Sequence, residues 1–470
     1  MFVNCRVRFG FLSAFLTLVV SLALSPLTAY GGFLYLLNDD STGNRIYGFQ
    51  VNETTGELTA LPGFPVNALV GGINNIVSER MTVDPVNRRL YVLNEGSDSM
   101  SVYSIDPGTG AITPMPFSPV SLGSGTWNTV AVHPGGSPVI VSNGATGSGA
   151  FSFNITSTTA TPAVGNPFLV GATSAFSSRF SRDGAYFYVG GNTGSVIAGF
   201  SVSVADGVLT TLSGSPFPAG ATNTIAYATD ASGRLFGVDT NDAIRVFTST
   251  NGILSPVTGN PFISGLTQRR FGLIHPNGNF YIVAGNSGNN VGVYQISGSG
   301  AATTVAPVAG SPFATGGTTA NVLAMNQAGT FLYVGNRVSR NVSRFAVDPA
   351  TGILSGLAVQ ASNTLGTVGA INGIGYLPDL AASNAMISGR ITKADGTGAG
   401  KVVVHLSSMD GAVDLIALTN PFGYYSFPSV LTGATYTLTP SAKIFTFKPV
   451  SITLNHTGDI TDQNFTAVQE

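Results

Sequence analysis

The sequence predicts an all-β protein: a seven-bladed β-propeller followed by a small β-sandwich. Three observations lead to this fold class. A strand-rich unit recurs seven times at a spacing of about 50 residues, the length of a four-stranded propeller blade. The 470 residues include 60 glycines and 25 prolines without a strict glycine period, which is typical of short strands joined by turns. The composition then changes near residue 386, where a second domain is expected to begin.

Residues 1–29 are predicted to be a signal peptide. Arg6 and Arg8 precede an apolar run over residues 9–24, and Pro26 ends that run. The alternative is an uncleaved anchor helix, although membrane-spanning helices usually need about 20 apolar residues. Cleavage would leave a chain without cysteine, so packing and sheet hydrogen bonds alone would stabilise it outside the cell. We expect the protein to be secreted, periplasmic or at the cell surface, with no membrane span after cleavage.

Seven repeats indicate a propeller over residues 30–380. Each copy has an apolar strand ending in Tyr-Val or a similar pair, with Asn two or three positions later. An alternating strand follows, and in five copies it closes with Thr-Gly, Asp-Gly or Asn-Gly, which favour tight hairpins. Five copies also carry a Pro-Phe pair, whose Phe is expected to pack between neighbouring blades. The apolar strands are residues 33–36, 89–92, 138–141, 186–189, 235–238, 280–283 and 331–334.

The phase of the repeats predicts how the ring closes. In the later copies an inner strand precedes the apolar strand, but the first copy begins at Phe33 with no such strand before it. The seventh copy is followed by a spare strand at residues 371–376. We therefore expect this segment to pair with residues 33–36 and to complete the first blade, which removes the open sheet edge.

A second domain is expected at residues 386–470, after a linker at 381–385. All four lysines of the chain lie beyond residue 386, whereas the propeller region uses only arginine as its long cation. Short strands separated by turns such as Asp395-Gly396 indicate a β-sandwich. The expected strands are residues 386–392, 401–407, 424–427, 436–440, 451–454 and 464–467.

The repeat unit at residues 331–354 resembles the seven-bladed propeller lactonase family, which includes 6-phosphogluconolactonase-like and muconate-lactonising proteins. The resemblance extends over residues 33–379 and includes Gly-Ser-Pro-Phe at 214–217 and 310–313. The tail resembles the carboxypeptidase regulatory-like fold, related to transthyretin-like, Ig-like and carbohydrate-binding-like sandwiches. This second resemblance is carried by residues 387–392, 423–427 and 433–438.

The catalytic pattern of the lactonase family is not found here. That family places His before an inner strand and an Asp-Leu-Gly-x-Asp run after the next strand, and neither occurs in this chain. His133 and His275 each precede Pro at a turn where other copies have Asp, Ser or Asn, so a turn-forming role is favoured. No pair of histidines has metal-ligand spacing, and we expect neither a metal nor a cofactor.

Polar residues recur just before the expected inner strands, and the repeat phase would bring them to one mouth of the central channel. Arginine suits carboxylates or phosphates, and the single tryptophan suits a sugar face. The alternative is a rim of scattered charges that keeps an apolar protein soluble. The candidate ligand-binding residues are Glu79, Arg80, Trp127, Asn128, Arg179, Arg269, Arg270, Asn321 and Asn372, with Glu79 the catalytic base of a lactonase.

Composition and the candidate site leave three function classes. The net charge of −2 without a basic block argues against a nucleic-acid partner. The first class is an exported, non-catalytic binding propeller with an accessory, carbohydrate-binding sandwich. The second is a divergent lactone hydrolase with its site at one mouth of the channel, and the third is a structural envelope protein. The partner is unknown; candidates are a carbohydrate, an anionic small molecule and an envelope protein.

Overall fold

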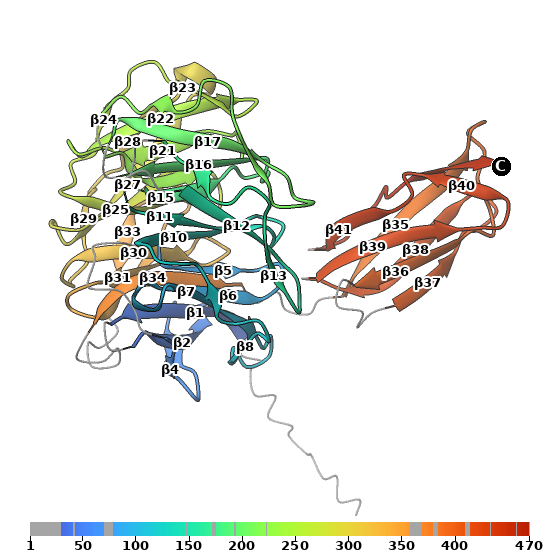
Figure 1. Cartoon of the computed structure of the whole chain (residues 1–470), viewed down its shortest axis with the longest axis horizontal. Coiled ribbons are helices and arrows are strands. Elements are labelled where there is room, and N and C mark those ends of the chain that lie inside the picture. Colours follow the sequence, from blue (N-terminus) through green and yellow to red (C-terminus); the bar gives the residue numbers. More distant parts are fainter. Residues whose placement is uncertain are drawn as a thin grey trace, which may run out of the picture.

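The structure is a computed structural model of the whole chain, and it describes most of the propeller and of the sandwich (Figure 1). The expected signal peptide at residues 1–29 and residues 381–383 of the expected linker lie outside the described residues. The described residues are 30–40, 43–69, 79–145, 149–171, 175–191, 194–221, 223–357, 369–378, 384–408, 414–432, 434–456 and 458–469.

Seven antiparallel sheets form the propeller, as the repeats predict. In each sheet four strands follow one another from the channel outward, and among the described residues six sheets have a short fifth strand that pairs with the third. The inner strands are β34 (Ala370–Leu377), β5 (Met81–Asp84), β10 (Trp127–Val132), β15 (Ala175–Phe180), β20 (Ile225–Thr229), β25 (Arg269–Ile274) and β30 (Ala320–Met325).

The second and third strands of each blade carry the repeated apolar pattern. The second strands are β1 (Tyr30–Asp39), β6 (Arg89–Asn94), β11 (Val139–Asn143), β16 (Tyr186–Gly191), β21 (Leu235–Val238), β26 (Phe280–Gly285) and β31 (Phe331–Asn336). The third strands are β2 (Arg45–Asn52), β7 (Ser99–Ile105), β12 (Gly149–Ile155), β17 (Val196–Val202), β22 (Ala243–Thr250), β27 (Asn290–Ser297) and β32 (Asn341–Val347).

The outer strands are short. Four of the fifth strands begin at the Phe of the repeated Pro-Phe pair, and the repeat pattern did not predict these strands. The fourth strands are β3 (Leu58–Ala60), β8 (Ile112–Pro114), β13 (Ala160–Pro162), β18 (Leu209–Thr211), β23 (Ile253–Pro256), β28 (Thr304–Pro307) and β33 (Leu354–Gly356). The fifth strands are β4 (Val66–Asn67), β9 (Val120–Ser121), β14 (Phe168–Leu169), β19 (Phe217–Pro218), β24 (Phe262–Ile263) and β29 (Phe313–Ala314).

The ring closes as the repeat phase predicts. Strand β34 pairs antiparallel with β1, so Leu34 lies opposite Tyr376 and Leu36 opposite Ile374. Inner strands of neighbouring blades contact one another all around the channel. They approach closely at Gly375, where an added Cβ would lie 2.4 Å from a side-chain carbon of Val83. The closing strand is thus held on both sides, and the first blade has no exposed inner edge.

Buried tyrosines link neighbouring blades. Tyr35 donates a hydrogen bond of 2.7 Å to the carbonyl of Gly110, which belongs to the hairpin turn of the second blade. Tyr188 and Tyr333 make the corresponding bonds to hairpin glycines of their neighbouring blades. The repeated Tyr and the repeated hairpin Gly therefore form the same contact between neighbouring blades. The carbonyl of the buried glycine needs a hydrogen-bond donor, and the tyrosine hydroxyl supplies it.

The C-terminal strands form a β-sandwich of two four-stranded sheets around one apolar core. Two of its eight strands, β37 and β40, are absent from the expected set; the apolar side chains of β37 are largely exposed, and β40 has only four residues. The strands are β35 (Asn384–Lys393), β36 (Val403–Ser408), β37 (Asp414–Leu418), β38 (Tyr424–Leu431), β39 (Ala434–Ser441), β40 (Phe445–Lys448), β41 (Ile452–His456) and β42 (Phe465–Gln469).

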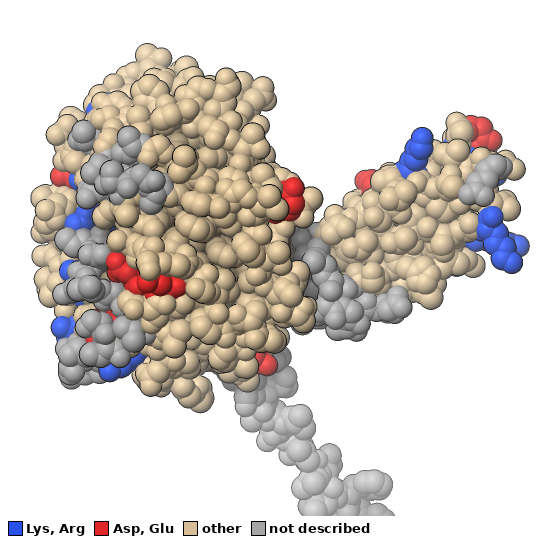
Figure 2. Space-filling view, viewed as in Figure 1, with Lys and Arg blue, Asp and Glu red and all other residues tan. Residues whose placement is uncertain are grey.

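The described residues contain two helical turns, the 3₁₀ helices η1 (Glu95–Ser97) and η2 (Gly300–Ala302), and no α-helix. No helix in these ranges is long and apolar enough to cross a membrane. Uncharged residues cover most of the visible propeller surface, in line with the 9% content of charged residues (Figure 2).

Candidate active site

A cavity of about 560 Å³ occupies the channel between the middle and the C-terminal ends of the inner strands. Pro85, Pro134 and Arg182 lie at its exposed mouth. Glu79 and Arg179 line its inner end. A cavity of this size is within the range that binds small molecules in proteins.

Glu79 and Arg179 form an ion pair in the wall of this cavity. Arg179 Nη1 lies 3.0 Å from Glu79 Oε2, and the two residues come from the second and the fourth blade. The Arg179 guanidinium also donates to the carbonyl of Ser178 at 2.7 Å and lies 4.9 Å from the ring centre of Phe271. A guanidinium has five N–H donors, so part of its donor capacity remains for a ligand in the cavity.

The carboxylate of Glu79 is held by hydrogen bonds from β15. Ser177 Oγ donates to Glu79 Oε1 at 2.8 Å, and the backbone N–H of Ser178 donates to Oε2 at 3.0 Å. Ser177 Oγ in turn accepts a hydrogen bond from the backbone N–H of Tyr227 at 3.0 Å, which directs its own proton at Glu79. Glu79 Oε1 accepts one hydrogen bond, from Ser177, and has two lone pairs, so it can accept another hydrogen bond.

Burial is the largest influence on the pKa of Glu79 and raises it above the ordinary carboxyl value. The charge of Arg179 and the hydrogen bonds from Ser178 and Ser177 oppose part of this rise. A carboxyl of this kind exchanges its proton closer to neutral pH than an exposed one, which suits a general base or acid.

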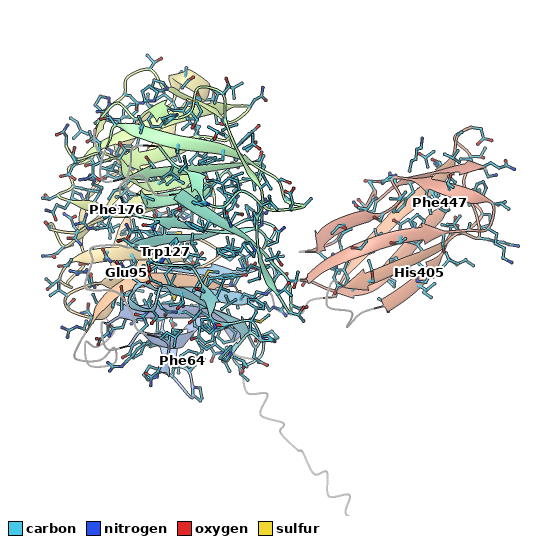
Figure 3. All side chains as sticks on the ribbon, viewed as in Figure 1. Phe64, Glu95, Trp127, Phe176, His405 and Phe447 are labelled. Atoms are coloured by element: carbon cyan, nitrogen blue, oxygen red, sulfur yellow. The ribbon has the colours of Figure 1, made fainter. Side chains whose placement is uncertain are left out.

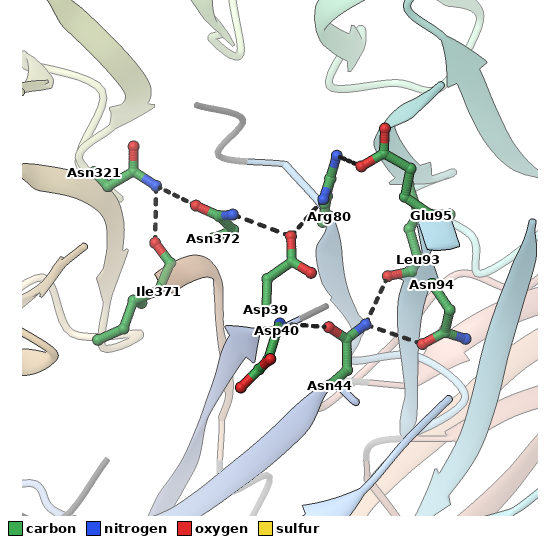
Figure 4. A network of polar contacts seen from close by, with 10 residues as sticks. All are labelled: Asp39, Asp40, Asn44, Arg80, Leu93, Asn94, Glu95, Asn321, Ile371 and Asn372. Atoms are coloured by element: carbon green, nitrogen blue, oxygen red, sulfur yellow. Dashed lines mark hydrogen bonds and ion pairs between the residues drawn. The ribbon is translucent and has the colours of Figure 1, made fainter. Parts of the chain in front are cut away.

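Three of the sequence-predicted residues instead form a buried polar network. Arg80 is fully buried and pairs with Asp39 and Glu95. Asn372 donates to the same Asp39 carboxylate at 3.0 Å, and Asn321 donates to Asn372 at 3.1 Å (Figure 4). This network joins the first, second and seventh blades where the ring closes, so its side chains serve each other and not a ligand.

Trp127 does not offer the expected flat face to a sugar. Its side chain is fully buried inside the propeller, edge-on to Phe151 with ring centres 5.0 Å apart (Figure 3). Its indole N–H donates to the carbonyl of Gly123 at 3.1 Å. Asn128 is buried as well and donates to the carbonyl of Ala175 at 2.9 Å.

Arg269 and Arg270 lie together at the start of β25. Arg269 donates to the carbonyl of Asn223 at 2.6 Å and lies 4.0 Å from Asp242. Arg270 donates to the carbonyl of Arg269 at 3.1 Å. Burial, with the nearby charges of Arg269 and Arg337, lowers the pKa of Arg270 to about 10. The two arginines are not among the residues that line the cavity at Glu79.

β-Bulges determine where three of the sequence-predicted residues lie. Six of the seven inner strands shift register near their starts, β5 being the exception, and the extra residue is re-aimed relative to the regular alternation. Asn128, Asn321 and Asn372 occupy these shifts, so they belong to the strands and do not precede them. A repeat alignment identifies the position of a residue in its blade but not the direction in which its side chain points.

Sequence reasoning missed the two serines that support Glu79 and most of the cavity wall. The only signal for Ser177 and Ser178 was a pair of hydroxyls directly before Arg179 in an inner strand. His133 lies at the cavity mouth, and His275 bonds the carbonyl of Gly329 in the next blade at 2.9 Å. Among the described residues no group of three His, Cys, Asp or Glu side chains is placed to hold a metal ion.

The chain is similar to one protein family in part of its sequence and to several solved structures in its fold. The family model described as "Lactonase, 7-bladed beta-propeller" matches residues 258–365. A candidate 6-phosphogluconolactonase from Bacteroides fragilis is similar in structure, with a TM-score of 0.57 and 14% identity over 74% of this chain and 99% of that one. The periplasmic gluconolactonase of Pseudomonas aeruginosa has a TM-score of 0.55 and 15% identity over 73% and 99%.

These similarities show the propeller fold. A candidate 6-phosphogluconolactonase from Bacteroides uniformis gives nearly the same values, a TM-score of 0.56 and 14% identity over 74% and 99%. No curated protein sequence matches the chain significantly. The family match covers parts of the fifth to seventh blades, and it does not include Glu79 or Arg179. The resemblance of the C-terminal sandwich to a carboxypeptidase regulatory-like domain stays a prediction.

Proposed function

We propose that the protein is a divergent lactone hydrolase whose active site is the channel cavity at Glu79 and Arg179. The observation that carries the proposal is the buried Glu79 carboxylate, whose pKa is raised, beside a cation in the wall of an open cavity. The local match to the propeller lactonase model and the fold shared with gluconolactonases support the same chemistry.

In the proposed reaction Glu79 is the general base. Its carboxylate takes a proton from a water molecule, and the resulting hydroxide attacks the lactone carbonyl carbon. The carbonyl oxygen becomes an oxyanion, which the remaining N–H donors of Arg179 stabilise. The ring C–O bond then breaks, Glu79 returns its proton to the leaving alkoxide, and the product is a hydroxy acid. Ser177 keeps the Glu79 carboxylate in position throughout.

The binding-module hypothesis has less support than the hydrolase. It depended on Trp127 and several arginines sharing a ligand at one mouth, whereas Trp127 and Arg80 are fully buried in contacts within the protein. Export remains part of the proposal because the apolar N-terminal segment over residues 9–24 has the composition of a signal peptide.

The variant Glu79→Gln tests the proposal. We expect kcat/KM for a hydrolysed lactone to fall about 10²–10⁴-fold, the usual contribution of a general base, while the fold persists in circular dichroism. Asp230→Asn is the matched control, because Asp230 is also buried and pairs with Arg234 at 2.6 Å but does not line the cavity. Full activity in Glu79→Gln, or no hydrolysis of any lactone by the natural protein, would overturn the proposal.

A further inference from the structure

Between the inner end of the cavity and its mouth, most of the side chains that line the wall are apolar. Residues from six of the seven inner strands line the cavity. Those that carry the argument are Met81, Val132, Ala228, Phe271, Leu273 and Ile274. Val132, Phe271, Leu273 and Ile274 are only partly buried, so part of their apolar surface is open to the cavity.

Polar side chains lie mainly at the two ends of the cavity. Glu79 and Arg179 are at the inner end, and His133, Ser181 and Arg182 are at the mouth. Along the wall between them the polar side chains are Thr82 and Thr229. Thr229 already donates its hydroxyl proton to the carbonyl of Phe180 at 2.7 Å.

This distribution is a poor match for a polyhydroxylated ring. Each sugar hydroxyl that loses water without gaining a partner costs free energy, and the wall supplies few side-chain partners. An alkyl or aromatic substituent has the opposite preference, since burial of its apolar surface is favourable.

We infer that the cavity selects lactones with an apolar substituent over sugar lactones. This inference rests on the proposed function. The lactone carbonyl lies at Glu79 and Arg179, and the substituent extends along the wall formed by Val132, Leu273 and Ile274 toward the mouth. The volume of about 560 Å³ is enough for a lactone ring with a substituent of several carbons.

A series of δ-lactones with unbranched alkyl substituents of increasing length tests the inference, with glucono-δ-lactone as the polar comparison. Each methylene that the wall buries should raise kcat/KM about fourfold, the factor equivalent to about 0.8 kcal/mol. Binding of the same series to Glu79→Gln, measured by calorimetry, should strengthen in parallel and does not depend on hydrolysis.

Val132→Thr places a hydroxyl in the wall at nearly constant volume. We expect it to lower kcat/KM for the longer alkyl lactones about fourfold or more, and so to reduce their advantage over glucono-δ-lactone. Val204→Thr is the matched control, because Val204 is exposed and lies outside the cavity.

The possible outcomes separate the two proposals. A preference for glucono-δ-lactone, or rates and affinities independent of alkyl length, would overturn the inference and leave the hydrolase intact. Binding that strengthens with alkyl length without any hydrolysis would support the apolar selectivity and overturn the hydrolase. Neither hydrolysis nor binding of any lactone would overturn both.

Discussion

Removing the charge of Arg80 should destabilise the propeller at its closure. Arg80 is fully buried between Asp39, which is also fully buried, and Glu95, which is nearly so. Arg80→Met keeps the apolar stem but removes the cation that pairs with both carboxylates. Breaking a buried ion pair from one side typically costs about 3–5 kcal/mol. Because Asn372 still donates to Asp39, we expect a loss near the lower value, about 3 kcal/mol.

Urea unfolding at about pH 7 measures this loss. Adding Asp39→Asn to Arg80→Met should restore part of the stability, because it removes one of the two buried negative charges. Arg182→Met is the control: Arg182 is exposed and has no ion pair among the described residues, so its loss should stay within about 0.5 kcal/mol.

A loss below about 1 kcal/mol in Arg80→Met would refute this reasoning, because it would mean that the buried carboxylates do not need the cation. A larger loss that Asp39→Asn does not partly restore would refute its electrostatic origin and point to packing alone.

Further predictions concern the blade contacts, the active site and the sandwich. Tyr35→Phe removes the bond to the Gly110 carbonyl and should cost about 1 kcal/mol in denaturant unfolding; an unchanged midpoint would show that the bond contributes nothing. Because Glu79 must be ionised to act, kcat/KM should fall on the acid side at a pH above the ordinary carboxyl value. Arg179→Met should move that limb to higher pH, since the cation favouring the carboxylate is gone, and an unmoved limb would contradict the pairing. Residues 386–470 should show a cooperative melt when expressed alone.

The repeats made the propeller predictable because each blade repeats the same local requirements. The hairpin glycines at Gly110 and Gly252 have positive φ, as the Thr-Gly and Asn-Gly pairs indicated. The pairing of residues 371–376 with 33–36 followed from phase alone and is confirmed by the register of β34 on β1. The exact domain bounds stay a prediction, although β35 begins at Asn384, within the expected linker.

The candidate site was only partly predictable. Glu79 and Arg179 were identified as polar residues just before the expected inner strands, and the structure joins them in one ion pair. The supporting hydroxyl of Ser177 and the apolar wall at Leu273 were missed, because neither differs in sequence from ordinary strand residues. Trp127 was expected to face a ligand, but an aromatic ring at this position gains more from burial against the next strands.

The sequence by itself determined the number of blades, the closing strand and the change to a second sheet-rich domain. These depend on periodicity and turn chemistry, which are local properties written repeatedly along the chain. Only the tertiary structure decided which polar side chains share a cavity. Ser177 reaches Glu79 across 98 positions of sequence, and bulges in the inner strands turn neighbouring residues in different directions. Such contacts depend on the radius of the closed ring and on side-chain direction, and neither can be read from a repeat alignment.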